Sequence, residues 1–146
     1  MSSKPIPQPT PETEAFWQGC AQGELRLQHC LGCSHVQHPP RKLCSGCFGE
    51  DVDWRRASGR GRIRSWSVVV SPGAPGFEEE VPFISVLVEL DEGPTMLSVL
   101  RGCTAEEVDF EQAVEVIFEQ RSEDIFVPYF RLVAAADAQS ERDLGP

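Results

Sequence analysis

The sequence predicts a mostly β fold in which an N-terminal helix and a rubredoxin-like zinc ribbon precede a five-stranded barrel of the OB type. Two Cys-x-x-Cys pairs lie a short loop apart in CLGCSHVQHPPRKLCSGC, residues 30–47. From residue 61 onward, five short segments carry β patterning, and TAEEVDF separates the third from the fourth. Five strands with a helical insertion at that point are typical of an OB barrel.

Length and composition fit one domain, or two small domains joined by a linker. We expect a mobile N-terminus at 1–10, the helix and ribbon at 11–58, the barrel at 59–133 and a disordered tail at 134–146. No apolar run approaches the ~18–20 residues that a membrane-spanning helix needs. MSSKPIPQPTPETE lacks the apolar core of a signal peptide, so we expect a cytoplasmic protein. In that compartment, close cysteine pairs indicate metal or redox chemistry.

The N-terminal helix is predicted within TPETEAFWQGCAQG. Thr10 can cap it, Pro11 suits its first position, and Gly23 can terminate it. Phe16 and Trp17 give the helix an apolar side. Two alternatives remain open for this side: it packs on the protein's own domain, or it anchors the helix to a partner.

A metal site is predicted from the pattern C-x2-C-x10-C-x2-C, formed by Cys30, Cys33, Cys44 and Cys47. Each pair can bend into a knuckle, and four thiolates complete the coordination of tetrahedral zinc with no open position. Iron in a rubredoxin-like site is the alternative, because the same four-sulfur geometry accepts either metal. We therefore predict a structural metal site with zinc as the expected occupant.

Other histidines and cysteines could join a metal or catalytic site. His29, His35 and His38 flank the quartet, which already fills four positions, so we expect them in loops or exposed to solvent. Cys20 and Cys103 are unpaired by spacing and are interpreted as small apolar fillers. Since Cys103 precedes the predicted helical turn in RGCTAEE, the alternative to the filler interpretation at that position is a catalytic thiol.

The barrel strands are predicted near 61–70, 82–90, 95–101, 114–120 and 127–133. DEGP between the second and third strands is a tight hairpin turn. Thr104 followed by Glu107 has the form of a capping box, which predicts a single helical turn before the fourth strand. GRGR at 59–62 is interpreted as a bend at the barrel entry rather than as a phosphate loop.

Charge is unevenly distributed along the chain. Residues 41–64 carry seven basic and three acidic side chains, whereas residues 65–146 carry four basic and seventeen acidic ones. A phosphate backbone would meet a small basic patch beside a repulsive surface, which disfavours nucleic acid as a partner. The alternative function is a single-stranded nucleic-acid-binding module, with Trp66 and Phe83 as its candidate stacking platform.

An ordered series of motifs resembles one known family. FWQGCAQGELRLQHCLGCSHVQHPPRKLCSGC, WRRASGRGRIRSWSVV and VPFISVLVELDEGPTMLSVLRGC are followed by PYFR, over about residues 12–132. The series is similar to the acyl-CoA-associated zinc-ribbon plus OB-fold family, long called domain of unknown function thirty-five. The chain departs from that family at FEQAVEV, where a Gly-Met turn usually precedes the fourth strand.

The resemblance implies a non-catalytic subunit of a thiolase-fold enzyme that cleaves acyl-CoA thioesters by thiolytic or retro-aldol chemistry. It implies an assembly of two plus two subunits in which the small subunit stabilises its partner and helps to bind the CoA thioester. Arg41, Arg60 and Arg62 are then candidates for contact with CoA phosphates, and Phe16 and Trp17 for docking on the partner. A solvated or partner-facing charge cluster is the alternative for the arginines.

The sequence offers no recognisable catalytic set. It lacks a Ser/His/Asp combination, a Cys/His pair with a group to orient it, a phosphate-binding glycine loop and an open metal position. We therefore expect that this chain is not an enzyme by itself. An independent enzyme that uses Cys103 or the metal is the third hypothesis.

Overall fold

The computed structural model describes residues 4–133, so the predicted disordered tail lies outside the described residues. The elements follow in the order α1 (Glu14–Ala21), β1 (Arg26–Cys30), β2 (Val36–Gln37), β3 (Val52–Arg56), β4 (Arg60–Val69), β5 (Phe83–Leu90), β6 (Thr95–Arg101), the 3-10 turn η1 (Ala105–Glu107), β7 (Ala113–Gln120) and β8 (Phe126–Leu132). No helix within residues 4–133 is long and apolar enough to cross a membrane.

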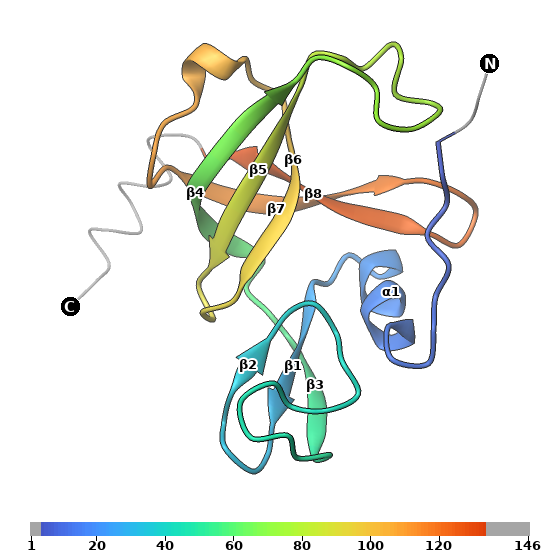
Figure 1. The fold of residues 1–146 in the computed structure, drawn as a ribbon, viewed down its shortest axis with the longest axis vertical. Helices are drawn as coiled ribbons and strands as arrows, with labels where there is room; N and C mark the ends of the chain where they lie inside the picture. The colour runs from blue at the N-terminus through green and yellow to red at the C-terminus, as the bar shows by residue number, and fades with distance from the viewer. Residues whose placement is uncertain (1–3, 134–146) are drawn as a thin grey trace.

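Two sheets make up the fold, and Figure 1 shows the ribbon below the barrel. The ribbon is a three-stranded sheet in the order β2-β1-β3, and the barrel is closed in the order β4-β5-β6-β8-β7. This order, with η1 between β6 and β7, confirms the predicted OB barrel. Each predicted barrel strand lies within one residue of its observed bounds. The short ribbon strands β2 and β3 were not predicted.

The N-terminal helix begins later than predicted. The Thr10 carbonyl oxygen accepts hydrogen bonds from the N–H groups of Thr13 (3.0 Å) and Glu14 (2.8 Å), and the Thr13 hydroxyl accepts one from the Thr10 N–H (2.8 Å). These bonds close a turn ahead of the helix, so α1 starts at Glu14 with Thr13 as its N-cap. The prediction that Thr10 caps the helix was therefore wrong, because its hydrogen bonds serve the preceding turn.

The end of the helix follows the prediction. Gly23 has φ = 76°, in the left-handed region that glycine adopts readily. Its N–H bonds to the Cys20 carbonyl oxygen (3.1 Å), and the Glu24 N–H bonds to that of Gly19 (2.8 Å). This pair of bonds is a Schellman motif, which turns the chain from α1 into β1.

A single hydrophobic core joins the ribbon to the barrel. Phe16 and Cys20 of α1 and Leu27 of β1 belong to the same buried cluster as Ile63 of β4 and Phe130 of β8. Helix α1 contacts both β1 and β8, so it lies between the two sheets (Figure 1). The two modules are therefore packed together and do not form separate cores.

The barrel entry and its turns agree with the sequence interpretation. Gly59 has φ = 77°, and a Cβ on Gly61 would lie 2.4 Å from the Glu89 carbonyl oxygen. These constraints explain both glycines without a phosphate ligand. The capping box is also present, with the Thr104 N–H donating to the Glu107 carboxylate at 3.0 Å.

Candidate metal centre and surface sites

The four quartet cysteines meet at one point between the two knuckles. The Sγ atoms of Cys30 and Cys47 are 3.6 Å apart, as are those of Cys33 and Cys44, and all four lie within 4.8 Å of one another. A disulfide would bring two sulfurs to about 2.05 Å. A tetrahedron with metal–sulfur bonds of about 2.3 Å has edges of about 3.8 Å. The donor set and its spacing therefore fit a structural metal ion with four protein ligands.

Backbone N–H groups favour the thiolate form that a metal needs. The Cys33 N–H donates to Cys30 Sγ (3.4 Å), and the Gly46 N–H donates to Cys44 Sγ (3.3 Å). Burial raises the pKa of the Cys44 thiol, but hydrogen bonds from the N–H groups of Cys47 and Gly46 and from neighbouring thiols lower it to about 6. The hydrogen bonds between the thiols raise the pKa of Cys33 and Cys47 in turn, so the bare quartet favours one thiolate at Cys44. Preformed donors of this kind fix the orientation of the sulfurs before the metal binds.

Two buried glutamines hold the loop that carries the second knuckle. Gln28 on β1 and Gln37 on β2 are 4% and 6% exposed. Gln28 Nε2 donates to the Arg41 carbonyl oxygen (2.8 Å), and Gln28 Oε1 accepts from the Arg41 N–H (2.8 Å) and from Gln37 Nε2 (2.7 Å). Gln37 Oε1 accepts from the N–H of Ser45, the neighbour of Cys44, at 2.8 Å. Gln37 Nε2 also donates to the Leu43 carbonyl oxygen (3.2 Å), so four hydrogen bonds connect the sheet to the loop and the second knuckle, and a fifth joins the two glutamines.

Sequence reasoning missed both glutamines. Apolar and polar residues alternate in ELRLQHC, which puts Gln28 on the polar side of β1, but the loop between the knuckles covers this side chain. The sequence carries no signal that distinguishes these two glutamines from exposed ones. Buried side-chain amides are usually fully hydrogen-bonded, and this pair is.

The three histidines are not part of the four-sulfur cluster found among the described residues. His35 is exposed, and its Nε2 lies 3.0 Å from the Ser45 hydroxyl, so it links the two knuckles. His38 packs against Phe16 with ring centres 5.5 Å apart, and burial lowers its pKa. His29 departs from the expectation, because it lies half-buried on β1 rather than in a loop.

The surroundings of the two remaining cysteines raise the pKa of their thiols. Cys20 is 1% exposed, and burial raises its pKa to about 12. Burial and the neighbouring Glu107 carboxylate raise the pKa of Cys103. A nucleophilic cysteine needs the opposite shift, so both sites favour the filler interpretation over a catalytic thiol.

The two aromatic docking candidates on α1 differ in exposure. Phe16 is 5% exposed and belongs to the shared core, so it packs on its own chain. Trp17 is partly buried and meets Phe16 edge-to-face, with ring centres 5.1 Å apart. Of the two, Trp17 alone presents surface to a partner.

The three arginine candidates for CoA contact lie on two modules. Arg41 lies on the loop between the knuckles, in a groove of about 310 Å³ that Lys42 and Trp54 also line. Arg60 and Arg62 begin β4 on the barrel. Arg62 Nη1 lies 3.8 Å from the Glu111 carboxylate, so its charge is partly compensated. Two cations and an aromatic ring meet in this groove, and the carboxylates of Glu12 and Glu50 line it as well.

Trp66 and Phe83 do not form one stacking platform. Trp66 pairs directly with Val86 of β5, and Phe83 pairs with Val69 of β4. Directly paired residues of antiparallel strands share a face, and Val86 faces the core. Because Phe83 is three residues from Val86 on the same strand, the two aromatic rings point to opposite faces of the sheet. This removes the feature on which the nucleic-acid alternative depended.

The knuckles expose apolar side chains around the metal centre. Leu31, Leu43 and Phe48 are 57%, 37% and 76% exposed, and we call these three residues the knuckle patch. Phe48 has φ = 63°, a left-handed conformation that costs an ordinary residue about 1–2 kcal/mol. Glycine would relieve that cost at this position. An exposed phenylalanine in a strained conformation is therefore unfavourable for the isolated chain.

Comparison with known proteins covers both modules. The family model described as ChsH2, rubredoxin-like zinc ribbon domain, matches residues 17–53, and that described as ChsH2, C-terminal OB-fold domain, matches residues 54–119. A DUF35 domain-containing scaffold protein of Methanothermobacter thermautotrophicus is 30% identical over 115 residues, which cover 77% of this chain and 86% of that protein.

A longer relative and a solved structure share the same two modules. The probable enoyl-CoA hydratase alpha subunit of Thermomonospora curvata is 31% identical over 118 residues, which cover 80% of this chain. The chain spans only 36% of the length of that relative. The solved structure titled Ltp2-ChsH2(DUF35) aldolase superposes with a TM-score of 0.79 at 27% identity, over 88% of this chain and 99% of that one.

Proposed function

Since this chain belongs to the ChsH2 and DUF35 family of zinc-ribbon and OB-fold proteins, we propose that it is a non-catalytic accessory subunit of an enzyme complex that acts on acyl-CoA. The observation that carries the proposal is the likeness to the chain of the Ltp2-ChsH2(DUF35) aldolase structure, 99% of which is covered. The hydratase alpha subunit supports the link with CoA chemistry, because it contains the same two modules within a longer protein.

The finer form of the proposal concerns the partner. In this form the catalytic subunit has a thiolase fold, and the complex contains two copies of each chain. Of thiolytic and retro-aldol cleavage, the likeness to an aldolase favours the retro-aldol reaction. This chain then stabilises the partner and contributes to the CoA thioester site.

The knuckle patch is the proposed docking surface. Burying these three side chains against a partner removes apolar surface from water, which stabilises the complex relative to the isolated chain. Phe48 is the proposed anchor, since aromatic residues in central pockets dominate the energy of protein interfaces. Trp17 on α1 is a second candidate contact. Zinc is the proposed metal, with iron as its rival, and its role is to hold the two knuckles in the docking geometry.

The groove beside Arg41 is the better candidate for contact with CoA phosphates. Arg41 is exposed there beside Lys42 and Trp54, and its attraction for phosphate competes with the carboxylates of Glu12 and Glu50, which line the same groove. Arg62 shares the Glu111 carboxylate with Arg64, which weakens its attraction for phosphate. A phosphate contact there therefore has to compete with an existing ion pair.

Assembly with an identified partner tests the proposal. We expect the tagged chain to co-purify in a stoichiometric complex with an acyl-CoA enzyme, and the double substitution L31S/F48S to weaken that complex at least tenfold. Leu97, which is 72% exposed on the barrel, provides the matched control as Leu97→Ser. Metal content checks that the double variant retains its ribbon. Cys44→Ser should lose both the metal and the partner.

Two results would refute this reading. One is a chain that remains alone at low salt in the presence of the acyl-CoA enzyme of its own cell. The other is a double variant that assembles as tightly as the unsubstituted chain. For the CoA contact, Arg41→Ala within the complex should raise the KM for the thioester, whereas Arg60→Ala and Arg62→Ala should change it less.

A further inference from the structure

The second half of β4 has a neighbouring strand on one side only. Its first residues, Arg60–Arg62, pair with β7, and the backbone of Ile63 continues this contact through hydrogen bonds with Gln112 (3.0 Å) and Glu111 (2.9 Å). Beyond Ile63, β4 pairs with β5 alone among residues 4–133. Because the backbone groups of an antiparallel strand point alternately to its two sides, every second residue of 65–69 presents its N–H and C=O groups to an open edge.

This open edge carries little of the protection that exposed edges have in other proteins. Such edges are commonly guarded by charged side chains or proline. A bulge lies at the start of this one, but residues 65–70, SWSVVV, contain neither a charged residue nor a proline. We call these six residues the β4 edge. Uncharged segments rich in β-branched and aromatic residues pair readily with a further strand.

An apolar row runs along the β4 edge. Trp66, Val68 and Val70 are 37%, 43% and 75% exposed. Trp66 and Val68 pair with Val86 and Ile84 of β5, which are 0% and 5% exposed, so this row belongs to the inner face of the barrel. It reaches the surface because no strand of residues 4–133 lies beyond it. An added strand would cover the row and remove apolar surface from water.

A cleft of about 530 Å³ adjoins the β4 edge. Val68 and Ile84 line it from the barrel, and residues 102–106 line it from the segment that joins β6 to β7. Figure 1 shows η1, which this segment carries, on the β4 side of the barrel. One extended segment therefore fits beside β4, whereas the edge of a second folded copy would meet the η1 segment. The occupant that the cleft admits is a single strand.

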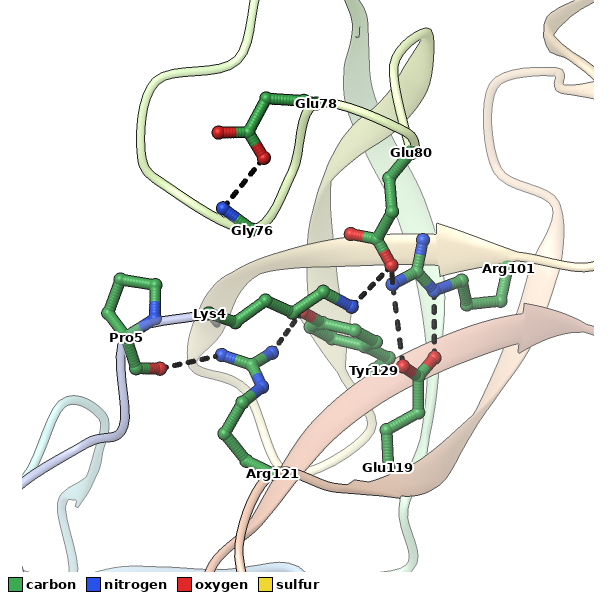
Figure 2. A network of polar contacts seen from close by, with 9 residues as sticks. All are labelled: Lys4, Pro5, Gly76, Glu78, Glu80, Arg101, Glu119, Arg121 and Tyr129. Atoms are coloured by element: carbon green, nitrogen blue, oxygen red, sulfur yellow. Dashed lines mark hydrogen bonds and ion pairs between the residues drawn. The ribbon is translucent and has the colours of Figure 1, made fainter. Parts of the chain in front are cut away.

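The outer rim of the cleft is already occupied by contacts within the chain. The Arg101 guanidinium donates to the carboxylates of Glu119 (2.7 Å) and Glu80 (2.9 Å), and Arg121 donates to the Pro5 carbonyl oxygen (3.0 Å). Figure 2 shows these side chains drawn together with the N-terminal residues. Because they are paired, an occupant gains more on the inner side, beside the β4 edge.

Charge indicates which kind of segment fits. Residues 102–112 contain four acidic residues and no lysine or arginine. Glu106 of this segment is exposed, lines the cleft, and makes no ion pair with another residue of the range 4–133. Complementary charge steers a partner and fixes its orientation. A basic residue is therefore favoured at the end of the occupant that lies in the cleft.

We propose that the β4 edge binds an extended, basic segment of another polypeptide by strand addition. The segment lies antiparallel to β4, in the position that β7 occupies beside Arg60–Arg62. Main-chain hydrogen bonds hold it, and its alternate apolar side chains cover Trp66 and Val68. Its N-terminal end carries the basic residue into the cleft. This binding goes beyond the accessory function and uses no residue of the knuckle patch, so either proposal can fail without the other.

NMR titration of the full-length, metal-loaded chain tests the proposal with the blocked heptapeptide KRVTVTL as the probe. We expect saturable shifts of the amides of residues 65–70 and 103–106. The scrambled peptide KRTTVVL lacks the alternation and should bind at least tenfold more weakly. The peptide EDVTVTL reverses the charge and should bind about fivefold more weakly, since exposed charge pairs each contribute about 0.2–1 kcal/mol.

Two methylated peptides identify strand addition itself. One carries N-methyl groups on its threonine nitrogens, and the other carries them on its valine and leucine nitrogens. Alternate N–H groups of a strand point to opposite sides, so only one of these peptides loses the hydrogen bonds to β4. We expect that peptide to lose binding and the other to retain it. If both bind as tightly as KRVTVTL, the proposal is overturned.

A pair of protein variants locates the site. Val68→Lys should weaken binding of KRVTVTL at least tenfold, because the added strand would bury the new ammonium group and its own basic end would be repelled. Leu97→Lys, at a position 72% exposed on β6, is the matched control and should not change it. The proposal is also overturned if millimolar KRVTVTL gives no saturable shift, if the shifts lie elsewhere, or if Val68→Lys binds normally. Sedimentation that shows a dimer of this chain, dissociated by Val68→Lys, would assign the edge to a second copy instead.

Discussion

Replacement of Gln28 by leucine isolates the contribution of the buried amide pair to the metal centre. The leucine removes three hydrogen bonds: two with the backbone of Arg41 and one with the side chain of Gln37. Each buried bond contributes about 0.5–1.5 kcal/mol net, so three together contribute about 3 kcal/mol. Burial of the leucine offsets about 1 kcal/mol of this loss. We expect the variant to be destabilised by about 2 kcal/mol.

Two measurements check this expectation. Urea unfolding at a fixed metal concentration gives the stability, and transfer of the metal to a chromogenic chelator gives the rate at which the second knuckle opens. Metal transfer should be faster in Gln28→Leu, since the released loop carries Cys44. Gln18→Leu, at an exposed position of α1, is the matched control and should change neither quantity. If Gln28→Leu unfolds and releases metal like the unsubstituted chain, the amide pair does not support the site.

Two further substitutions test the barrel. Gly61→Ala should destabilise the protein by about 1–3 kcal/mol in urea, because its Cβ would lie 2.4 Å from the Glu89 carbonyl oxygen; Gly73→Ala, with nothing within 4 Å, should be nearly neutral. Burial raises the pKa of Glu80, but its cationic partners Lys4 and Arg101 outweigh burial and lower the pKa below 4.5. The stabilisation that the ionised carboxylate provides is therefore present above pH 4.5 and is lost as the pH falls through the lowered pKa. Glu80→Gln should therefore flatten the acid limb of Tm against pH, and an unchanged limb, or the same flattening in the exposed Glu79→Gln, would contradict this assignment.

The barrel was predictable because its strands combine strict alternation with clear turn residues. In β5, Ile84, Val86, Val88 and Leu90 are all buried, and the residues between them are half-buried. Period-two burial of this kind identifies both the strand and its inner face. The metal quartet was predictable for a different reason, since the spacing of its cysteines is a direct requirement of four-sulfur coordination.

The face of each β4 side chain could not be predicted from alternation. Continuous alternation would place Arg62, Arg64, Trp66 and Val68 on one face of the strand. A bulge between Ile63 and Ser65 shifts the register, so that Trp66 and Val68 pair with inward-facing residues of β5. One extra residue exchanges the two faces of the strand. The same bulge removes the stacking platform.

The shared core limits which part of the fold depends on the metal. Leu25 and Leu27 lead into the first knuckle, but they are buried in the same cluster as the barrel residues Ile63 and Phe130. Loss of the metal therefore leaves β1 anchored and releases chiefly the two knuckles, which are attached by few apolar contacts. The knuckle patch therefore depends on the metal for its shape, whereas the barrel does not. A chelator should abolish docking on the partner and leave the barrel folded.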